Sequence, residues 1–284
     1  MKHKIFHGLR WVIMTLSLLF LAFGIRLTGK WLHTTDIPVF SCPFNTDQVI
    51  HSYCYYLSHL NKLVEYHSVK YAITYIIIFI ILAIVFGRVF CGFICPMGYL
   101  QDIVWKIRDI LHIEGFSRKE KFVESIKTAR YLVLFVFLSI TFFGFDFCSI
   151  CPAAITTQSI AGFKQVINVG FIFGIILMIL GFFMRRFWCN ICPLGYLVGV
   201  FHKISLFRIK KDCTACTKCR ACYEACPMKI KEIYTDDDKD VTKTECIFCG
   251  ECIKKCPEDK ALSISIGNIK IYTSSRKDFE EYHK

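Results

Sequence analysis

Two cysteine runs near the C-terminal end constrain this chain more than any other feature. Each run has the spacing Cys-x2-Cys-x2-Cys-x3-Cys and is followed by proline. Paired runs of this kind hold two 4Fe–4S clusters, and the fourth cysteine of each run binds the cluster of the other run. We therefore predict one cluster on Cys216, Cys219, Cys222 and Cys256, and a second on Cys246, Cys249, Cys252 and Cys226. Zinc ribbons or disulfides are the alternative, but neither requires two complete runs that each end in proline. The pattern thus predicts a chain that moves electrons.

Four apolar stretches decide the predicted fold class. They cover residues 11–29, 71–90, 131–147 and 166–184 of a chain that is 54% hydrophobic. A membrane-crossing helix needs about 20 apolar residues, and no small-residue cleavage site marks the first stretch as a removable signal. We predict an all-α four-helix transmembrane domain over residues 1–206. A small α+β two-cluster ferredoxin domain follows at 207–266, with strands at 207–210 and Leu262–Ile266. A polar tail occupies 267–284.

The basic residues predict an orientation. Lysine and arginine gather before the first stretch, between the second and third, and after the fourth; examples are Lys4, Arg10, Arg88, Arg108, Arg130, Arg185 and Arg186. The positive-inside rule then places both termini and the ferredoxin domain in the cytoplasm, at the cell membrane. The net charge of +12 flanks apolar stretches and lines no single face, which argues against a nucleic-acid partner and for membrane lipid.

The apolar part contains an internal repeat. Arg88-x2-Cys91-x3-Cys95-Pro96 follows the second stretch, and Arg186-x2-Cys189-x2-Cys192-Pro193 follows the fourth. The matching ends suggest two related halves, at about 9–112 and 129–207. Each motif leads into an amphipathic segment, 101–112 or 198–207. Thiolates are good ligands for iron, so the repeat predicts a shared inner-face metal or iron–sulfur site on Cys91, Cys95, Cys189 and Cys192. Four buried free thiols are the alternative.

Four further cysteines fall on the predicted outer face: Cys42, Cys54, Cys148 and Cys151. Two interpretations stay open. They form disulfides or redox-active dithiols, Cys42–Cys54 and Cys148–Cys151, as an oxidising compartment favours, or all four hold an outer metal or iron–sulfur site. Cys213, three residues before the first run, is expected to be a spare thiol. His202, near the second amphipathic segment, is expected to be interfacial or solvated.

With these motifs the sequence resembles the NapH/NosR type of membrane ferredoxin over about residues 9–266. The combination of two membrane Cys-Pro motifs with two ferredoxin runs carries the resemblance. The second membrane motif is one residue shorter than the usual Cys-x3-Cys-Pro, and Cys213 is additional. The resemblance implies quinol oxidation or electron relay to a partner outside the cytoplasm, within a larger redox complex and with quinone as a possible cofactor. A quinol dehydrogenase component is one form of this role, and whether the chain is itself an enzyme is left open.

Two other function classes are compatible with the sequence. One is a transmembrane exporter of reductant to outer thiols or metal ions, which would need Cys148 and Cys151 to cycle. The other is an assembly or regulatory factor whose clusters sense redox state. The terminal donor and acceptor have no signature in the sequence.

Overall fold

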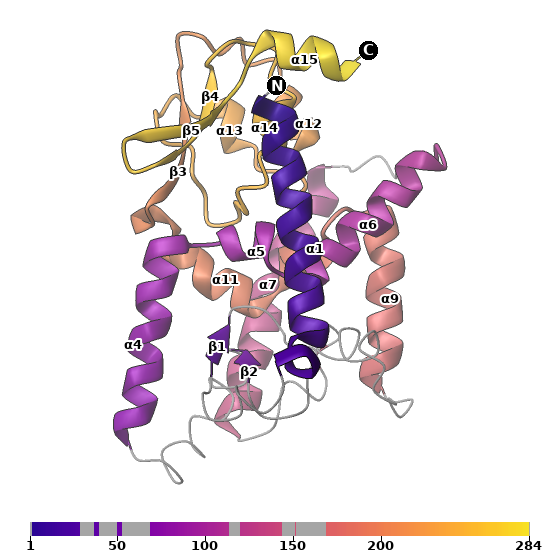
Figure 1. The fold of residues 1–284 in the computed structure, drawn as a ribbon, viewed down its shortest axis with the longest axis vertical. Coiled ribbons are helices and arrows are strands. Elements are labelled where there is room, and N and C mark those ends of the chain that lie inside the picture. Colours follow the sequence, from indigo (N-terminus) through magenta and orange to yellow (C-terminus); the bar gives the residue numbers. More distant parts are fainter. Residues whose placement is uncertain are drawn as a thin grey trace. The chain divides into compact units, whose positions relative to one another are not determined.

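The structure is a computed structural model that describes residues 2–28, 37–39, 50–52, 69–113, 120–143, 151 and 169–283. Four of its helices are α1 (Lys2–Thr28), α4 (Val69–Phe86), α7 (Glu120–Phe142) and α9 (Val169–Phe183), shown in Figure 1. Each overlaps one of the four apolar stretches. The sequence therefore predicts where the long helices lie.

The prediction of an all-α four-helix transmembrane domain is wrong. Within the ranges just given, no helix is both long enough and apolar enough to cross a membrane. Helices α4 and α9 have 18 and 15 residues, which at 1.5 Å per residue gives about 27 and 22 Å against about 30 Å of hydrocarbon. The longer helices α1 and α7 each contain a buried cation, Arg10 or Arg130. This part of the chain also contains strands, since β1 (Ile37–Val39) pairs in parallel with β2 (Ile50–Ser52).

The short elements after α4 and α9 follow the internal repeat. After α4 come α5 (Val89–Phe93) and α6 (Pro96–Ile110); after α9 come α10 (Phe187–Ile191), α11 (Pro193–Val200) and the 3-10 helix η3 (Phe201–Ile204). Pro96 and Pro193 are each the first residue of a helix, where a missing N–H costs nothing and the fixed φ favours the helical turn. Both Cys-Pro motifs thus end one short helix and begin the next.

The chain divides into two compact units. The first contains Met1–Val12, Ile81–Phe93 and Tyr196–Lys284; the second contains Ile13–Ile80 and Ile94–Gly195. In the first unit, β3 (Phe207–Lys211), β4 (Leu262–Ile266) and β5 (Ile269–Thr273) form an antiparallel sheet in the order β3-β4-β5. Ile209 and Ile264 are register partners and are buried in the core. Both predicted strands are confirmed.

Four short helices complete the first unit. They are α12 (Ala221–Ala225), α13 (Glu232–Thr235), α14 (Glu251–Lys254) and α15 (Arg276–His283). Strand β5 and helix α15 occupy the segment expected to be a polar tail. Tyr272 of β5 is 4% exposed and stacks on Phe6 at 4.6 Å between ring centroids. One buried aromatic residue thus ties the segment to the unit.

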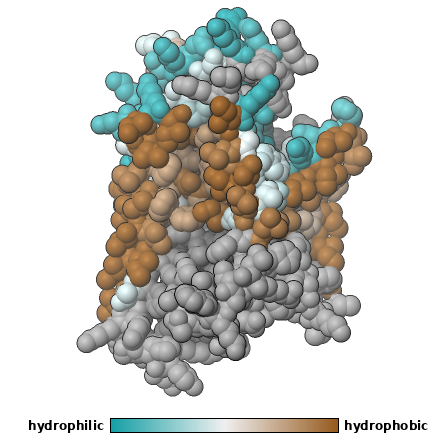
Figure 2. Space-filling view, in the orientation of Figure 1, coloured by the Kyte–Doolittle hydropathy of each residue, from teal (hydrophilic) through white to brown (hydrophobic). Residues whose placement is uncertain are grey.

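The second unit is built on helices α6, α7, α9 and α10. Phe137 of α7 and Leu177 of α9 are each 1% exposed and mark its core. Large apolar side chains also point outward, among them Ile77 of α4, Phe135 of α7 and Ile176 of α9. Figure 2 shows apolar surface along α4 and α9.

Candidate functional site

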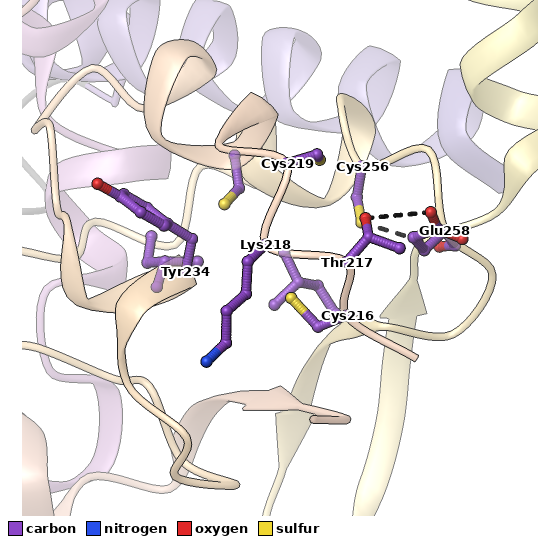
Figure 3. Close-up of a pocket in the computed structure, with 10 residues that line it drawn as sticks. Cys216, Thr217, Lys218, Cys219, Tyr234, Cys256 and Glu258 are labelled. Carbon is purple, nitrogen blue, oxygen red and sulfur yellow. Dashed lines mark hydrogen bonds between the residues drawn. The ribbon is translucent and has the colours of Figure 1, made fainter. Parts of the chain in front are cut away.

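The first of two cysteine-lined pockets lies around the start of α12 (Figure 3). Its lining includes Cys216, Cys219, Cys222 and Cys256, the set predicted for the first cluster. Cys222 and Cys256 are buried, whereas Cys219 is exposed. At the rim, the Thr217 hydroxyl donates a hydrogen bond to the Glu258 carboxylate at 3.2 Å. The pocket therefore joins three cysteines of the first run to the last cysteine of the second.

The second pocket has the complementary lining. It is bounded by Cys226, Cys246, Cys249 and Cys252, together with Ile209, Met228 and Ile230. All four thiols are buried. Ile233 of α13, which is 2% exposed, lines both pockets. The two pockets are therefore neighbours separated by one apolar side chain.

Both cysteine runs adopt the same unusual backbone. Lys218 and Phe248 occupy equivalent positions and both have a φ of 54°. Arg220 and Gly250 are equivalent too, with φ of 66° and 77°. Left-handed conformations are costly for residues other than glycine, so their recurrence at matched positions indicates that the cysteines dictate the path. Each third cysteine then lies in the first turn of a short helix, α12 or α14.

The pKa shifts of the thiols agree with the division of the cysteines between the two pockets. Burial raises the pKa of Cys222 to about 12, and negative charge on Cys256, Cys216 and Cys219 adds to the rise. Burial likewise raises the pKa of Cys226 to about 11, with a contribution from Cys249. Cys256 and Cys226 are thus each influenced by thiols of the opposite run, as crossed ligation requires.

This donor set fits an iron–sulfur cluster. Several thiolates gathered in a buried place repel one another and lose hydration, so they need a cationic partner to stay deprotonated. Bound iron supplies that charge, and sulfur is the ligand that iron–sulfur clusters take. The arrangement of the eight cysteines is the one predicted, and the binding of iron by each of them stays a prediction.

His202 lies in the protein core and not at an interface or in solvent. It is fully buried, and its Nε2 lies 2.7 Å from the carbonyl oxygen of Cys246. A carbonyl can only accept, so Nε2 donates. Burial, and then the charge of Arg88, lower the pKa of His202 to about 4, so the ring is neutral. The expectation of an interfacial or solvated histidine is wrong, because a lone histidine gives no sequence signal of its partner.

Arg88 and Cys91 lie on a segment that contacts the second cysteine run. Arg88 is 3% exposed, and its Nη1 donates to the carbonyl oxygen of Thr244 at 3.1 Å. A Cβ on Gly92 would overlap the carbonyl oxygen of Ile247, so only glycine fits there. Cys91, beside Gly92 in α5, is therefore carried on a helix that packs against the loop between Cys246 and Cys249.

The other three cysteines predicted for an inner-face site belong to the second unit. Cys95 is the N-cap of α6, Cys189 is buried in α10, and the Cys192 sulfur accepts the Gly195 N–H at 3.5 Å. Across the described ranges, no three His, Cys, Asp or Glu side chains are placed to hold a single metal ion. The metal or iron–sulfur site on Cys91, Cys95, Cys189 and Cys192 stays a prediction.

Of the predicted outer-face cysteines, Cys151 lies within the described residues. Cys42, Cys54 and Cys148 lie outside the described residues, and Cys151 is buried. Both interpretations of this set stay predictions. Cys213 lines neither cysteine pocket; its sulfur lies 3.1 Å from the carbonyl oxygen of Asp237.

A basic groove lies next to the first pocket. Five lysines and two aspartates line it, together with three uncharged residues. The lysines are Lys210, Lys211, Lys239, Lys260 and Lys270, the aspartates are Asp212 and Asp237, and the uncharged residues are Cys213, Thr214 and Ser263. Lys218, on the rim of the first pocket, forms an ion pair with Asp237 of the groove at 2.9 Å. The groove and the exposed edge of the first pocket thus share one continuous surface.

Two family models match the chain in the regions just described. One, a 4Fe-4S binding domain, matches residues 71–114 and 166–212, which contain the two Cys-Pro motifs. The other, a 4Fe-4S dicluster domain, matches residues 215–262, which contain both cysteine runs. These matches show an iron–sulfur protein. No solved structure is significantly similar to the chain.

Similar proteins point the same way. The chain is 33% identical over 181 residues to an uncharacterized protein of Methanocaldococcus jannaschii. The aligned region covers 62% of this chain and 71% of that protein. It is 27% identical to the regulatory protein NosR of Pseudomonas aeruginosa, over 57% of this chain and 23% of NosR. It is also 27% identical to the ferredoxin-type protein NapH of Haemophilus influenzae, over 60% of this chain and 59% of NapH. The matched region is thus less than two thirds of NosR and NapH.

Proposed function

Because the chain belongs to the NapH/NosR-type family of 4Fe–4S electron-transfer proteins, we propose that it relays electrons from a quinol or cytoplasmic donor to a redox partner outside the cytoplasm. The two adjacent four-cysteine pockets support this proposal most directly. Iron–sulfur clusters supply one-electron chemistry when bound. Two neighbouring sites in one small unit suit a relay better than a single-turnover sensor.

The protein contributes burial and spacing to this task. Ile233 separates the pockets with one apolar side chain, and Met228 and Ile230, 1% and 2% exposed, help to keep water from the second pocket. Only the first set has an exposed cysteine, Cys219. We assign the first pocket to exchange with an external carrier and the second to exchange within the chain.

The basic groove supports a particular kind of external carrier. Its five lysines outnumber its two aspartates, and it adjoins the pocket that has the exposed cysteine. Charge complementarity accelerates association and fixes orientation at protein interfaces. An acidic electron-carrier protein docked in this groove would lie next to Cys219, and we propose such a protein as the cytoplasmic donor.

A membrane location for the relay is also part of the proposal. Outward-facing apolar side chains on α4, α7 and α9 support it, including Ile77, Phe135 and Ile176, which are 50%, 71% and 44% exposed. Large apolar surface of this kind marks contact with lipid or another protein. Flotation of the purified chain with phospholipid vesicles would test this location.

Reduction of the purified protein tests the relay itself. Anaerobically purified chain should contain about eight iron atoms and eight sulfides if two clusters are present. A quinol analogue, or a reduced acidic carrier, should then bleach the visible absorbance and produce an electron paramagnetic resonance (EPR) signal, with dithionite as the positive control. Intact clusters that dithionite reduces but neither donor does would overturn the relay.

A further inference from the structure

Three close contacts join the segment Gly87–Gly92 to the second cysteine pocket. Gly87 has a φ of 54°, and a Cβ on it would lie 2.5 Å from His202 Nδ1. Arg88 donates to the carbonyl oxygen of Thr244, and Gly92 packs on the carbonyl of Ile247. Thr244 and Ile247 lie on either side of Cys246 in the sequence. The segment therefore packs against the backbone on both sides of Cys246, one of the residues that line the second pocket.

Arg88 brings a positive charge to this contact with the second run. Its side chain is almost fully buried, and Gly199 leaves room for it: a Cβ there would meet Arg88 Cδ at 3.2 Å and overlap the Thr244 carbonyl oxygen. The Thr244 carbonyl that accepts the Arg88 hydrogen bond belongs to the residue two positions before Cys246, so the charge lies beside the second run. An arginine stays protonated in a protein, so this charge is fixed.

The first pocket has a different electrostatic setting. The cation on its rim, Lys218, has a side chain that is 52% exposed and is paired with Asp237. Water weakens the field of such an exposed charge. The buried charge of Arg88 is screened much less, because the effective dielectric constant is lower away from water.

A cluster becomes more negative when it is reduced, so a nearby fixed positive charge stabilises the reduced form. We propose that Arg88 is a positioning residue that raises the reduction potential of the cluster on Cys226, Cys246, Cys249 and Cys252. This inference rests on the proposed function, because it requires both clusters. Its consequence is that the electron step from the exposed first site to the buried second site is more favourable than it would be without Arg88.

Paired variants separate the charge of Arg88 from its hydrogen bond. Arg88→Gln removes the charge but keeps an N–H donor for Thr244, whereas Arg88→Lys keeps the charge. Iron and sulfide are measured first, and each cluster is then titrated by EPR-monitored redox potentiometry. Arg88→Gln should lower the potential of the second cluster alone, and Arg88→Lys should leave it near the wild-type value. Lys218→Gln, the matched change at the first rim, should leave the second cluster unchanged.

Several outcomes would overturn the proposal. Equal shifts of both clusters, no shift, or the same shift in the Gln and Lys variants would each do so. An Arg88→Gln chain that lacks the second cluster, or all iron, would also do so, because a charge that tunes a cluster is not needed to form it. A wild-type chain with fewer than two clusters would instead contradict the proposed function.

Discussion

The Asp102 carboxylate and the Arg186 guanidinium form a fully enclosed ion pair, with 2.6 Å between Oδ2 and Nη2. Arg185 adds a second contact to the other carboxylate oxygen at 3.0 Å. Arg186 also caps α10 with a left-handed backbone, and its carbonyl accepts a hydrogen bond from Asn190. One acidic residue of α6 thus fixes the corner that begins the second Cys-Pro motif.

Removal of the Asp102 charge should destabilise the second unit strongly. Asp102→Asn leaves Arg186 buried and without its carboxylate, a change that costs about 3–5 kcal/mol in buried pairs. The free energy of unfolding in urea measures this loss. Asp240→Asn is the control, because its partner Arg208 is 26% exposed and Asp240 is 41% exposed, and such pairs contribute about 0–1 kcal/mol. Equal effects of the two substitutions would contradict the assigned role of Asp102.

The burial of Arg88 and Arg186 was not predictable from the sequence. Each lies three residues before the first cysteine of a Cys-Pro motif. The positive-inside rule takes both as cytoplasmic residues that flank an apolar stretch. Each is buried instead, on Thr244 or on Asp102. Partners 156 and 84 positions away leave no local trace in the sequence. The shared Arg-x-x-Cys spacing was the available signal that these arginines have a structural role.

Crossed ligation predicts which cysteine substitutions share a phenotype. Cys256→Ala should remove the same EPR signal as Cys216→Ala, because both residues line the first pocket. Cys226→Ala should remove the signal that Cys246→Ala removes, since both line the second. Cys213→Ala is the control and should keep all iron. If Cys256→Ala and Cys246→Ala instead removed one common signal, each run would bind its own cluster.

The cysteine sets were predictable because their information is local. A run of fixed spacing specifies its own turns, and Lys218 and Phe248 adopt the same left-handed φ although their side chains have nothing in common. The strand over Leu262–Ile266 was predictable for the same reason. The packing of the Gly87–Gly92 segment against the second run was not predictable, because the contact of Gly92 with Ile247 depends on two backbones that approach from distant parts of the sequence.

Gly250 should be more sensitive to substitution than Gly267. Both have a positive φ, 77° and 56°, so alanine at either position costs about 1–2 kcal/mol of backbone strain. At Gly250 a Cβ would also meet Phe6 at 2.7 Å, and Phe6 is held by its stack on Tyr272. At Gly267 nothing lies within 4 Å. Overpacking typically adds about 1–3 kcal/mol.

Thermal unfolding and iron content distinguish the two glycine variants. Gly250→Ala should unfold at a lower temperature than Gly267→Ala and lose iron from the second cluster first, because Gly250 lies between Cys249 and Cys252. Gly267→Ala should retain both clusters. Indistinguishable variants would show that Phe6 moves aside freely and does not constrain the second run.

Charge reversal in the basic groove tests the docking of an acidic carrier. Lys239→Glu, Lys260→Glu and Lys270→Glu combined change the groove from five lysines and two aspartates to two lysines and five acids. Electrostatic steering changes association rates by about 10- to 1,000-fold, so stopped-flow reduction by an acidic carrier should slow by about tenfold or more at low salt. The difference should vanish at high salt, where charges are screened beyond about 3 Å. Reduction by dithionite should not change.

Lys277→Glu on the exposed face of α15 is the control outside the groove. A rate loss in that variant equal to the loss in the triple variant would show a nonspecific charge effect.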